Sequence, residues 1–421
     1  MSTAAQLSRV LLYSHDTYGL GHLRRNLVLA RHLLASARPP RVLLATGSPV
    51  IGQVTLPRGL AYVPLPPVIK TGADEYDSLD PLLGISLVRR ARTAVLSDVV
   101  VRWKPDVLVV DHAPHGMKAE LLPVFDALSR QSPPTRVVLG LRDILDEPER
   151  VAASWRAEGV VETLERVYDA ILVYGERSVF DLERLYRLPR SVAERLEYCG
   201  YVAGAPSHEP IVPPGLASGT EYVLGTVGGG GDGVEVLLAT VQAASAAGLA
   251  AVLCTGPLMP AADRAYLRDF VGAQRGVVVV EHLADVAAMA GGARCVVTRG
   301  GYNSMCEMVD LGVPTVVVPR SAPRLEQVLR AEAFERRGLV RVVKEGPGMV
   351  GRLARAVAIA AGEPARPHGQ LDLDGGARMV EALRRLVDGR AADGRVLRSS
   401  TTHSRVAVPC DLSREALGVP A

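Results

Sequence analysis

The stretch "VVTRGGYNSMCEMVDLGVPTVVVPR" (residues 296–320) places two glycines between a short apolar run and a polar segment, and a second apolar run follows. Glycines at a strand-to-helix turn let the backbone adopt unusual φ/ψ values and approach a ligand closely. We predict a helix that starts near Tyr302 or Asn303 and binds a phosphate at its N-terminus, with Asn303 or Ser304 as cap or donor. Glu307 lies one turn beyond Asn303 on the same face. Its carboxylate can accept hydrogen bonds from both hydroxyls of a ribose, although a solvated helix glutamate gives the same pattern.

A second glycine-rich segment, "TVGGGGDG" (226–233), also follows an apolar run and precedes a helical pattern. The backbone N–H groups of Gly228, Gly229 and Gly230 can face an anion at a helix N-terminus. A glycine run alone is also typical of a surface loop. Its place directly after a predicted strand favours the anion-binding interpretation.

Elsewhere the chain alternates short Val/Leu-rich runs with amphipathic stretches, which predicts parallel strands buried on both faces and joined by helices. The predicted strands are 9–14, 41–46, 106–112, 136–141, 170–175, 222–227, 250–256, 276–282, 294–300 and 314–320. The predicted fold class is α/β, with two Rossmann-like doubly wound parallel-sheet domains facing across a cleft. Ligands of such sheets bind beyond the carboxyl ends of the strands.

The predicted domain boundaries follow breaks in this alternation. The first domain covers residues 1–205, a Pro/Gly/Ser-rich linker covers 206–220, and the second domain covers 221–365. A last helix is predicted within 366–389. Residues 390–421 are expected to be a poorly ordered polar tail.

The composition limits the kinds of partner. The chain has 48 lysines and arginines against 45 aspartates and glutamates, a net charge of +3, which argues against nucleic acid as the main partner. Five cysteines are scattered singly with no CxxC pair, so we expect no zinc site, no disulfide framework and a cytoplasmic location. No apolar window predicts a membrane span, and the N-terminus shows no signal-peptide pattern.

The opening stretch and the "RLEQVLRAEAFERRGLV" that follows it (324–340) resemble the donor-binding half of family 28 glycosyltransferases, over about residues 220–345. That family includes the bacterial enzyme that adds N-acetylglucosamine to lipid I. The resemblance implies that the Gly300–Gly301 turn holds the diphosphate of a UDP-sugar and that Glu307 grips its ribose. It also places Glu326 and Gln327 at the donor hexose.

Two further positions follow from this resemblance. His282 and Leu283 correspond to the loop that cradles the base. Arg299, just before the glycine pair, departs from the best-known members of the family. It is a candidate to neutralise the charge of the leaving diphosphate, and equally a candidate partner in a surface ion pair.

The first domain carries its own glycine turn, "SHDTYGLGHLRRNLVLARHLL" (14–34), where Gly19 and Gly21 precede His22. As a dinucleotide fingerprint it fails, because Arg24 stands where the third glycine is needed, and no acidic residue follows the second strand. It resembles instead the G-x-G-H loop of two-domain (GT-B fold) sugar-nucleotide enzymes, in several of which this histidine faces the cleft. Gly21 is therefore a donor-binding candidate.

His22 is the candidate general base, because the helix dipole should lower its pKa and keep the ring neutral near pH 7. A structural histidine packed on the turn is the alternative, and His15 is a second candidate base. Arg24 and Arg25 could hold an anionic group, although a solvated helix face explains them as well.

Polar pairs end two other predicted strands, Asp111-His112 and Arg142-Asp143. If the sheet is parallel, both pairs face the cleft. Asp111 and Asp143 are therefore catalytic candidates that would orient the base or an acceptor hydroxyl. Buried acids that cap turns have the same sequence pattern.

Together these residues predict a glycosyltransferase that moves a hexose from a nucleotide-diphosphate sugar to an acceptor hydroxyl with inversion. No metal ion or other cofactor is expected, since glycine-turn amides and helix N-termini can stabilise the departing diphosphate. The acceptor is a small molecule or a lipid-linked molecule, with peripheral membrane contact left open. A nucleotide-sugar hydrolase or epimerase of the same fold is the alternative, and a non-catalytic sugar-nucleotide binder is a third.

Overall fold

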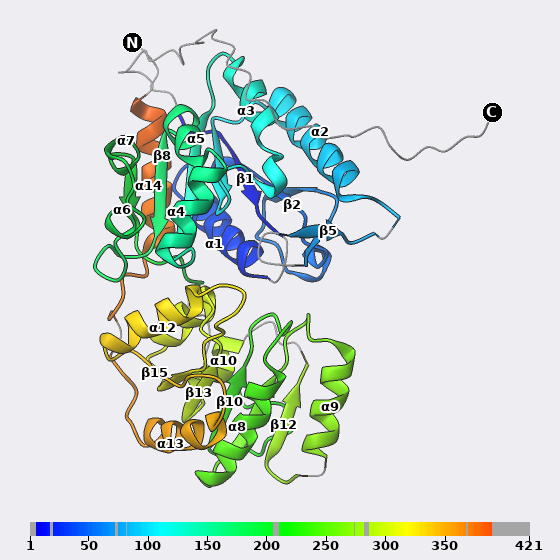
Figure 1. Ribbon diagram of the computed structural model, residues 1–421, viewed down its shortest axis with the longest axis vertical. Helices are drawn as coiled ribbons and strands as arrows, with labels where there is room; N and C mark the ends of the chain where they lie inside the picture. Colours follow the sequence, from blue (N-terminus) through cyan, green and yellow to red (C-terminus); the bar gives the residue numbers. More distant parts are fainter. Residues whose placement is uncertain are drawn as a thin grey trace, which may run out of the picture.

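The protein folds into two α/β domains stacked along the long axis of the molecule (Figure 1). The computed structural model describes residues 6–16, 20–71, 75–80, 82–204, 210–272, 274–281, 286–367 and 369–389. The predicted tail at 390–421 and residues 206–209 of the predicted linker lie outside these ranges. Residues 210–221 contain no helix or strand, as a linker requires.

The N-terminal domain is built on a seven-stranded parallel sheet in the order β3-β2-β1-β6-β7-β8-β9. Val and Leu side chains fill both faces of its central strands, which is why those strands have continuous apolar sequences. The strands are β1 Arg9–Ser14, β2 Arg41–Thr46, β3 Leu60–Pro64, β6 Val107–Asp111, β7 Arg136–Arg142, β8 Ala170–Tyr174 and β9 Leu196–Tyr198, beside a hairpin of β4 Val68–Lys70 and β5 Tyr76–Ser78. Its helices are α1 Gly21–Ala35, α2 Ile85–Trp103, α3 Leu122–Ser129, α4 Pro148–Ala157, α5 Val160–Val167, α6 Leu182–Leu185 and α7 Arg190–Ala193, with 3-10 turns at Ile51–Gln53 and Met117–Ala119.

The C-terminal domain repeats the plan with a six-stranded parallel sheet in the order β12-β11-β10-β13-β14-β15. Its strands are β10 Tyr222–Thr226, β11 Ala250–Cys254, β12 Val277–Val280, β13 Cys295–Thr298, β14 Thr315–Val317 and β15 Arg341–Val342. Its helices are α8 Val234–Ala246, α9 Ala261–Val271, α10 Val286–Gly291, α11 Tyr302–Asp310, α12 Glu326–Arg336 and α13 Met349–Ala361.

The last helix, α14 (Gly375–Asp388), returns to the N-terminal domain and packs against α1 (Figure 1). Leu383 of α14 is buried in the same apolar cluster as Leu27 of α1. That cluster continues into the C-terminal domain through Tyr302 and Phe334. The two domains therefore share one hydrophobic core on this side, and the C-terminal helix belongs structurally to the first domain.

The predicted fold class is confirmed, and each predicted strand is present. The expected helix start at Tyr302 is also correct. Five strands were not predicted: the edge strands β3, β9 and β15 and the hairpin strands β4 and β5. They are short, and edge strands lack the two-sided burial that makes central strands recognisable. None of the helices in the described ranges is long and apolar enough to cross a membrane.

Candidate active site between the two domains

A pocket of about 220 Å³ lies where the carboxyl ends of the strands in both domains face each other. The C-terminal domain contributes the β10–α8 turn, the β13–α11 turn and the start of α12. The N-terminal domain contributes the start of α1 and the end of β7. Many of the candidate site residues line it: Gly21, His22, Gly228, Gly229, Gly230, Arg299, Gly301, Asn303, Ser304, Glu326 and Gln327.

Both predicted glycine turns need glycine for their backbone geometry. Gly230 has φ +86, and a Cβ there would lie 2.0 Å from the carbonyl oxygen of Thr255. Gly300 has φ +82, and its Cβ would meet Cγ1 of Val317 at 2.8 Å. Gly301 differs, because it is the N-cap of α11 with φ −62 and has open space beside it. Gly301 therefore leaves room for a ligand at the position of its missing side chain, as do Gly228 of the other turn and Gly21 of the N-terminal wall.

Neither Asn303 nor Ser304 caps α11, which corrects one of the predicted roles. The N-cap is Gly301, and no side chain caps the helix. The amide Nδ2 of Asn303 donates instead to the carbonyl oxygen of Gly21 across the domain boundary, over 3.2 Å. Both side chains still border the pocket as possible donors to a ligand.

Glu307 lies beside the pocket and is bound by an arginine of the other domain. Its Oε1 atom accepts a hydrogen bond from Nη2 of Arg24 at 2.7 Å, and its side chain is 11% exposed. It is therefore not a solvated helix residue. A ribose at this carboxylate would have to share it with Arg24 or displace that guanidinium.

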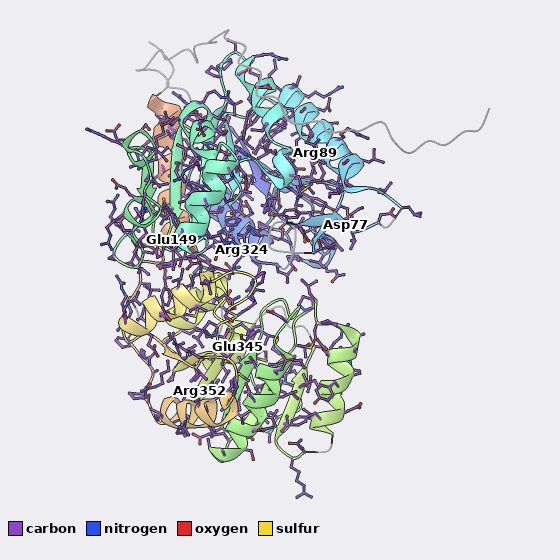
Figure 2. The ribbon with its side chains drawn as sticks, viewed as in Figure 1. Asp77, Arg89, Glu149, Arg324, Glu345 and Arg352 are labelled. Atoms are coloured by element: carbon purple, nitrogen blue, oxygen red, sulfur yellow. The ribbon has the colours of Figure 1, made fainter. Side chains whose placement is uncertain are left out.

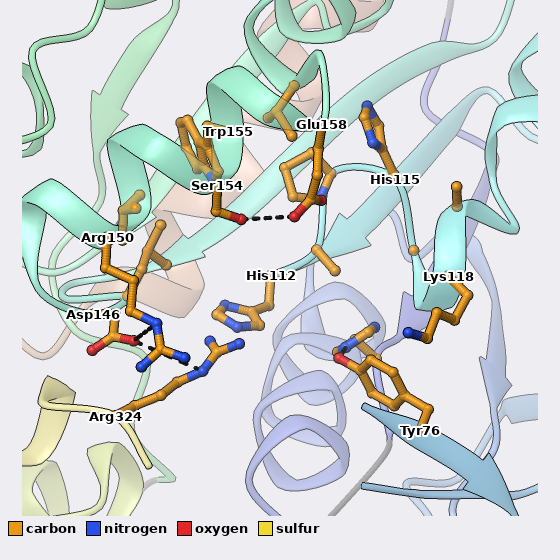
Figure 3. A pocket seen from close by; sticks show the side chains of 18 of the residues that line it. Tyr76, His112, His115, Lys118, Asp146, Arg150, Ser154, Trp155, Glu158 and Arg324 are labelled. Carbon is orange, nitrogen blue, oxygen red and sulfur yellow. Dashed lines mark hydrogen bonds and ion pairs between the residues drawn. The ribbon is translucent and has the colours of Figure 1, made fainter. Parts of the chain in front are cut away.

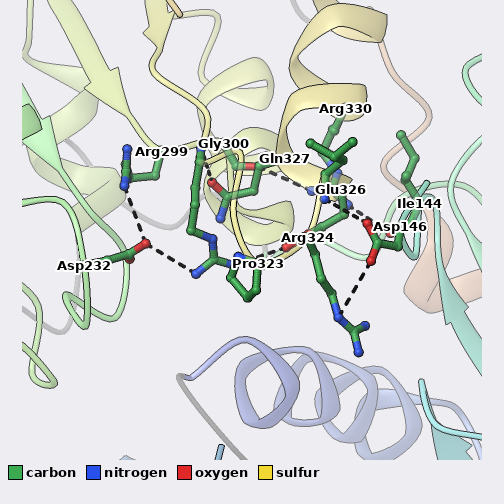
Figure 4. Close-up of polar contacts among 12 residues, drawn as sticks. Ile144, Asp146, Asp232, Arg299, Gly300, Pro323, Arg324, Glu326, Gln327 and Arg330 are labelled. Atoms are coloured by element: carbon green, nitrogen blue, oxygen red, sulfur yellow. Dashed lines mark hydrogen bonds and ion pairs between the residues drawn. The ribbon is translucent and has the colours of Figure 1, made fainter. Parts of the chain in front are cut away.

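Arg299 is buried rather than on the surface, with 8% of its area exposed. Its guanidinium pairs with the carboxylate of Glu345 and lies 3.5 Å from Asp232 (Figure 4). The ion-pair alternative thus describes its contacts, although the pair is buried. Two carboxylates hold this arginine in place at the pocket wall.

Glu326 and Gln327 open helix α12 and point toward the same wall (Figure 4). Oε1 of Gln327 accepts a hydrogen bond from the backbone N–H of Arg320 at 3.0 Å. Oε1 of Glu326 lies 3.4 Å from Nη2 of Arg320, whereas its Oε2 is buried and has no hydrogen-bond partner among the described residues. His282 and Leu283, the candidates for the base-binding loop, lie outside the described residues.

On the opposite wall, His22 and Asp111 form a hydrogen-bonded pair. Nδ1 of His22 lies 2.5 Å from Oδ2 of Asp111, and Nε and Nη2 of Arg25 donate to Oδ1 of the same carboxylate at 3.0 and 2.7 Å. Arg25 is 1% exposed, so the alternative of a solvated helix face is wrong for this residue. Sequence reasoning named all three residues but could not show that they bind one another.

The electrostatics of this pair favour a neutral imidazole. Burial lowers the pKa of His22 below its ordinary value, and the nearby Asp111 carboxylate offsets this only in part. Burial, not the helix dipole invoked from the sequence, is thus the main cause. Burial raises the pKa of Asp111, but the charges of Arg25 and His22 outweigh it and hold that pKa well below its usual range.

Asp143 occupies a different environment from Asp111. Its two carboxylate oxygens accept hydrogen bonds from Nε and Nη2 of Arg330, at 2.8 and 2.7 Å, and both side chains are almost fully buried. The pair joins the residue directly after β7 of one domain to α12 of the other. This carboxylate is an interdomain anchor in the structure, and we assign it no contact with an acceptor.

A larger pocket of about 540 Å³ opens into the N-terminal domain (Figure 3). His112 borders it, and its ring centroid lies 5.2 Å from that of His22 in the smaller pocket. Tyr76 and Trp155 contribute rings to the walls, and Arg324 reaches in from the C-terminal domain. Figure 2 shows Arg324 at the level where the two domains meet. The two pockets therefore approach each other at the histidines.

The described residues contain no cluster of three or more His, Cys, Asp or Glu side chains placed to hold a metal ion. The sequence has one Asp-x-Asp motif, Asp372-Leu373-Asp374, of the kind that metal-dependent transferases use. It lies just before α14, where the Asp372 carboxylate pairs with Arg378, and neither aspartate lines the interdomain pocket.

Comparison with known proteins agrees with this geometry. Residues 228–367 match the glycosyltransferase family 28 C-terminal domain. The resemblance recognised in the donor half of the sequence is thereby confirmed. A 74-residue segment is 36% identical to a UDP-N-acetylglucosamine–N-acetylmuramyl-(pentapeptide) pyrophosphoryl-undecaprenol N-acetylglucosamine transferase of Lachnoclostridium phytofermentans. The match spans 17% of this chain and 21% of the length of that relative.

Solved structures resemble the chain over nearly its whole length. The calicheamicin glycosyltransferase CalG4 aligns with a TM-score of 0.55 and 17% identity over 92% of this chain and 97% of that one. Arabidopsis thaliana UGT89C1 in complex with quercetin aligns with a TM-score of 0.55 and 16% identity over 90% of this chain and 94% of that one. A putative UDP-N-acetylglucosamine 2-epimerase from Listeria monocytogenes aligns with a TM-score of 0.60 and 14% identity over 91% of this chain and 97% of that one. These likenesses establish the two-domain GT-B fold.

Proposed function

We propose that the protein is a glycosyltransferase that moves a hexose from a nucleotide-diphosphate sugar, a UDP-sugar by the family resemblance, to an acceptor hydroxyl. The observation that carries this proposal is a pocket between the domains that is lined by His22 on one side and by residues of both C-terminal glycine turns on the other. A base on one wall and an anion-binding turn on the other are the two elements that transfer from an activated sugar requires.

In the proposed mechanism the donor lies against the C-terminal wall, with its diphosphate at Gly301 and the N-terminus of α11. Two groups approach Nδ1 of His22: the Asp111 carboxylate, which only accepts hydrogen bonds, at 2.5 Å, and Nη2 of Arg25, which only donates, at 3.0 Å. Because the carboxylate is the nearer, we assign the proton to Nδ1, which leaves the Nε2 lone pair available. Nε2 takes the proton of the acceptor hydroxyl as its oxygen attacks the anomeric carbon. The bond to the diphosphate breaks on the opposite side, which inverts that centre and requires no metal ion.

The acceptor would bind in the larger pocket of the N-terminal domain and reach His22 past His112. A volume of about 540 Å³ is within the range of small-molecule sites. Nucleic acid is not proposed as a partner, and the enzyme is proposed to act in the cytoplasm.

A lipid-linked acceptor is one form of this proposal, and one surface supports it. Four leucines that follow hairpin strand β5 or begin α2, namely Leu79, Leu82, Leu83 and Leu87, are 38 to 91% exposed. Arg89 and Arg90 are exposed close by in sequence (Arg89 is labelled in Figure 2). Exposed leucines beside cations suit a peripheral contact with anionic lipid. Cosedimentation with phosphatidylglycerol vesicles tests it, and a Leu82→Ser variant that sediments like the wild type would oppose it.

The deciding experiment screens UDP-, dTDP- and GDP-sugars for protection against heat unfolding and then for release of the nucleotide. Selective protection by one base identifies the donor. Release only with an added acceptor supports transfer, whereas release of free sugar without acceptor would identify a hydrolase. An altered hexose still attached to its nucleotide would identify an epimerase, and tight binding without turnover a non-catalytic binder.

A further inference from the structure

Arg142, the last residue of β7, differs from the other arginines that line the interdomain pocket. Five other arginines border this pocket, and each forms an ion pair: Arg24 with Glu307, Arg25 with Asp111, Arg299 with Glu345, Arg320 with Asp232 and Arg330 with Asp143. Arg142 forms no ion pair with any described residue, and its buried Nε has no hydrogen-bond partner. Arg142 is therefore a cation without a counter-ion among the described residues.

The surroundings of Arg142 make its positive charge unfavourable in the ligand-free protein. Burial, together with the neighbouring cations Arg25 and Arg330, lowers the pKa of Arg142 to about 10 despite the attraction of Glu326. An unpaired guanidinium in such a site is destabilising unless an anion from outside completes it. Its fork of N–H donors matches the oxygens of a phosphate.

Glu326, which attracts Arg142 electrostatically, has one carboxylate oxygen without a hydrogen-bond donor in the described part of the chain. Its Oε2 is buried and lacks a hydrogen-bond partner among the described residues, and a carboxylate oxygen accepts hydrogen bonds. One ligand that satisfies both residues carries an anionic oxygen next to a hydroxyl group. A sugar attached directly to a phosphate has both features within one small unit.

We propose that Arg142 binds the sugar-linked phosphate of the donor from the N-terminal wall, beside the contact with the donor hexose that the family resemblance implies for Glu326. This inference rests on the proposed function. It adds a contact from the domain that is otherwise given to the acceptor. Because the phosphate departs as the glycosidic bond breaks, Arg142 would offset the charge that develops on it. The donor would thus be held from both domains at the bond that reacts.

The experiment measures dissociation constants of UDP, inorganic pyrophosphate and uridine by calorimetry for the wild type and three variants. Arg142→Met removes the charge and keeps the length of the side chain, and Arg142→Lys keeps the charge without the fork. Arg156→Gln changes an exposed arginine on α4 and is the control. We expect Arg142→Met to raise the dissociation constants of UDP and pyrophosphate about tenfold and that of uridine less than about twofold. Arg142→Lys should be intermediate and Arg156→Gln unchanged.

The melting temperature of the ligand-free variants separates binding from folding. Arg142→Met should melt no lower than the wild type, because it removes a partly buried charge that has no ion-pair partner among the described residues. Wild-type affinity for UDP and pyrophosphate in Arg142→Met, or an equal loss for uridine, would overturn the inference. If the wild type binds pyrophosphate through Arg142 but none of UDP, dTDP and GDP, the proposed function fails while the anion site stands.

Discussion

Nδ1 of His22 lies 2.5 Å from Oδ2 of Asp111, and Arg25 holds the other oxygen of the same carboxylate. The carboxylate thus fixes both the orientation of the ring and the nitrogen that carries the proton. Because burial lowers the pKa of His22, the ring is neutral and basic at neutral pH. This geometry supports the proposed role of His22 as a general base.

We predict that His22→Ala retains donor binding and loses most turnover, by about 10²- to 10⁴-fold in kcat. Initial rates of nucleotide release and calorimetric affinity for UDP are the two measurements. His32→Gln, a change at the far end of α1, serves as control and should keep its rate. Normal turnover in His22→Ala would show that another residue takes the proton, and a loss in His15→Ala alone would identify His15.

Stability should fall as the pH drops below about 6.5, the ordinary pKa of histidine. Burial lowers the pKa of His22 and brings that of His112 well below its ordinary value, so the unfolded chain binds more protons than the folded one. Stability from these groups is therefore fully present above the unfolded pKa and is lost as the pH falls from there toward the lower folded pKa. His112→Asn should flatten this dependence, because it removes a group that titrates. Asparagine is chosen because it tolerates the φ of +70 at this position. Urea unfolding between pH 7.5 and 5 measures the effect, and an equally steep loss in the variant would contradict it.

The sequence predicted the central strands and the glycine turns because each depends on local composition. Continuous Val/Leu runs identify buried parallel strands, and glycines such as Gly230 and Gly300 are required by positive φ at strand ends. The position of His22 after a glycine turn was equally visible. These features need no knowledge of what packs against them.

The ion pairs across the domain boundary could not be predicted in the same way. Arg330 lies within α12 and looks like any helix arginine, yet it is fully buried against Asp143, 187 residues away. Arg24 and Glu307 are 283 residues apart. Nothing in the local pattern of either partner indicates such a contact, because it depends on how the two sheets face each other. The sequence placed Arg142 at a strand end that faces the cleft, but its lack of a partner is a property of the assembled pocket and could not be predicted.

Glu307→Gln should reduce the protection that UDP gives against heat unfolding, because a neutral amide accepts weaker hydrogen bonds from a ribose. The side chain is also held by Arg24, so Arg24→Ala is an informative companion. If Arg24 competes with the ribose, Arg24→Ala binds UDP at least as tightly as the wild type. Glu149→Gln, an exposed change on α4, is the control. Undiminished protection of Glu307→Gln by UDP would remove the ribose role.

The Arg330–Asp143 pair should be a large local contribution to the coupling of the domains. Arg330→Met leaves the buried Asp143 carboxylate without its partner and should cost about 3–5 kcal/mol in the free energy of unfolding. The double variant Arg330→Met/Asp143→Leu removes both charges and should recover much of that loss. The exposed Arg102–Asp98 pair provides a control, whose removal should change the free energy of unfolding far less. Urea unfolding tests this double-mutant cycle, and equal losses in the single and double variants would refute the assignment.

Alanine at the two adjacent glycines separates a folding requirement from a ligand requirement. Gly300→Ala forces a side chain into φ +82 and against Val317, so it should destabilise the protein by about 1–2 kcal/mol. Gly301→Ala meets open space at φ −62 and should change stability by less than about 0.5 kcal/mol. If the diphosphate binds at this turn, the new methyl group of Gly301→Ala occupies the position of the diphosphate and weakens the binding of UDP about tenfold. Chemical unfolding and calorimetry on the same samples measure both quantities, and a stable Gly301→Ala variant that binds UDP normally would place the diphosphate elsewhere.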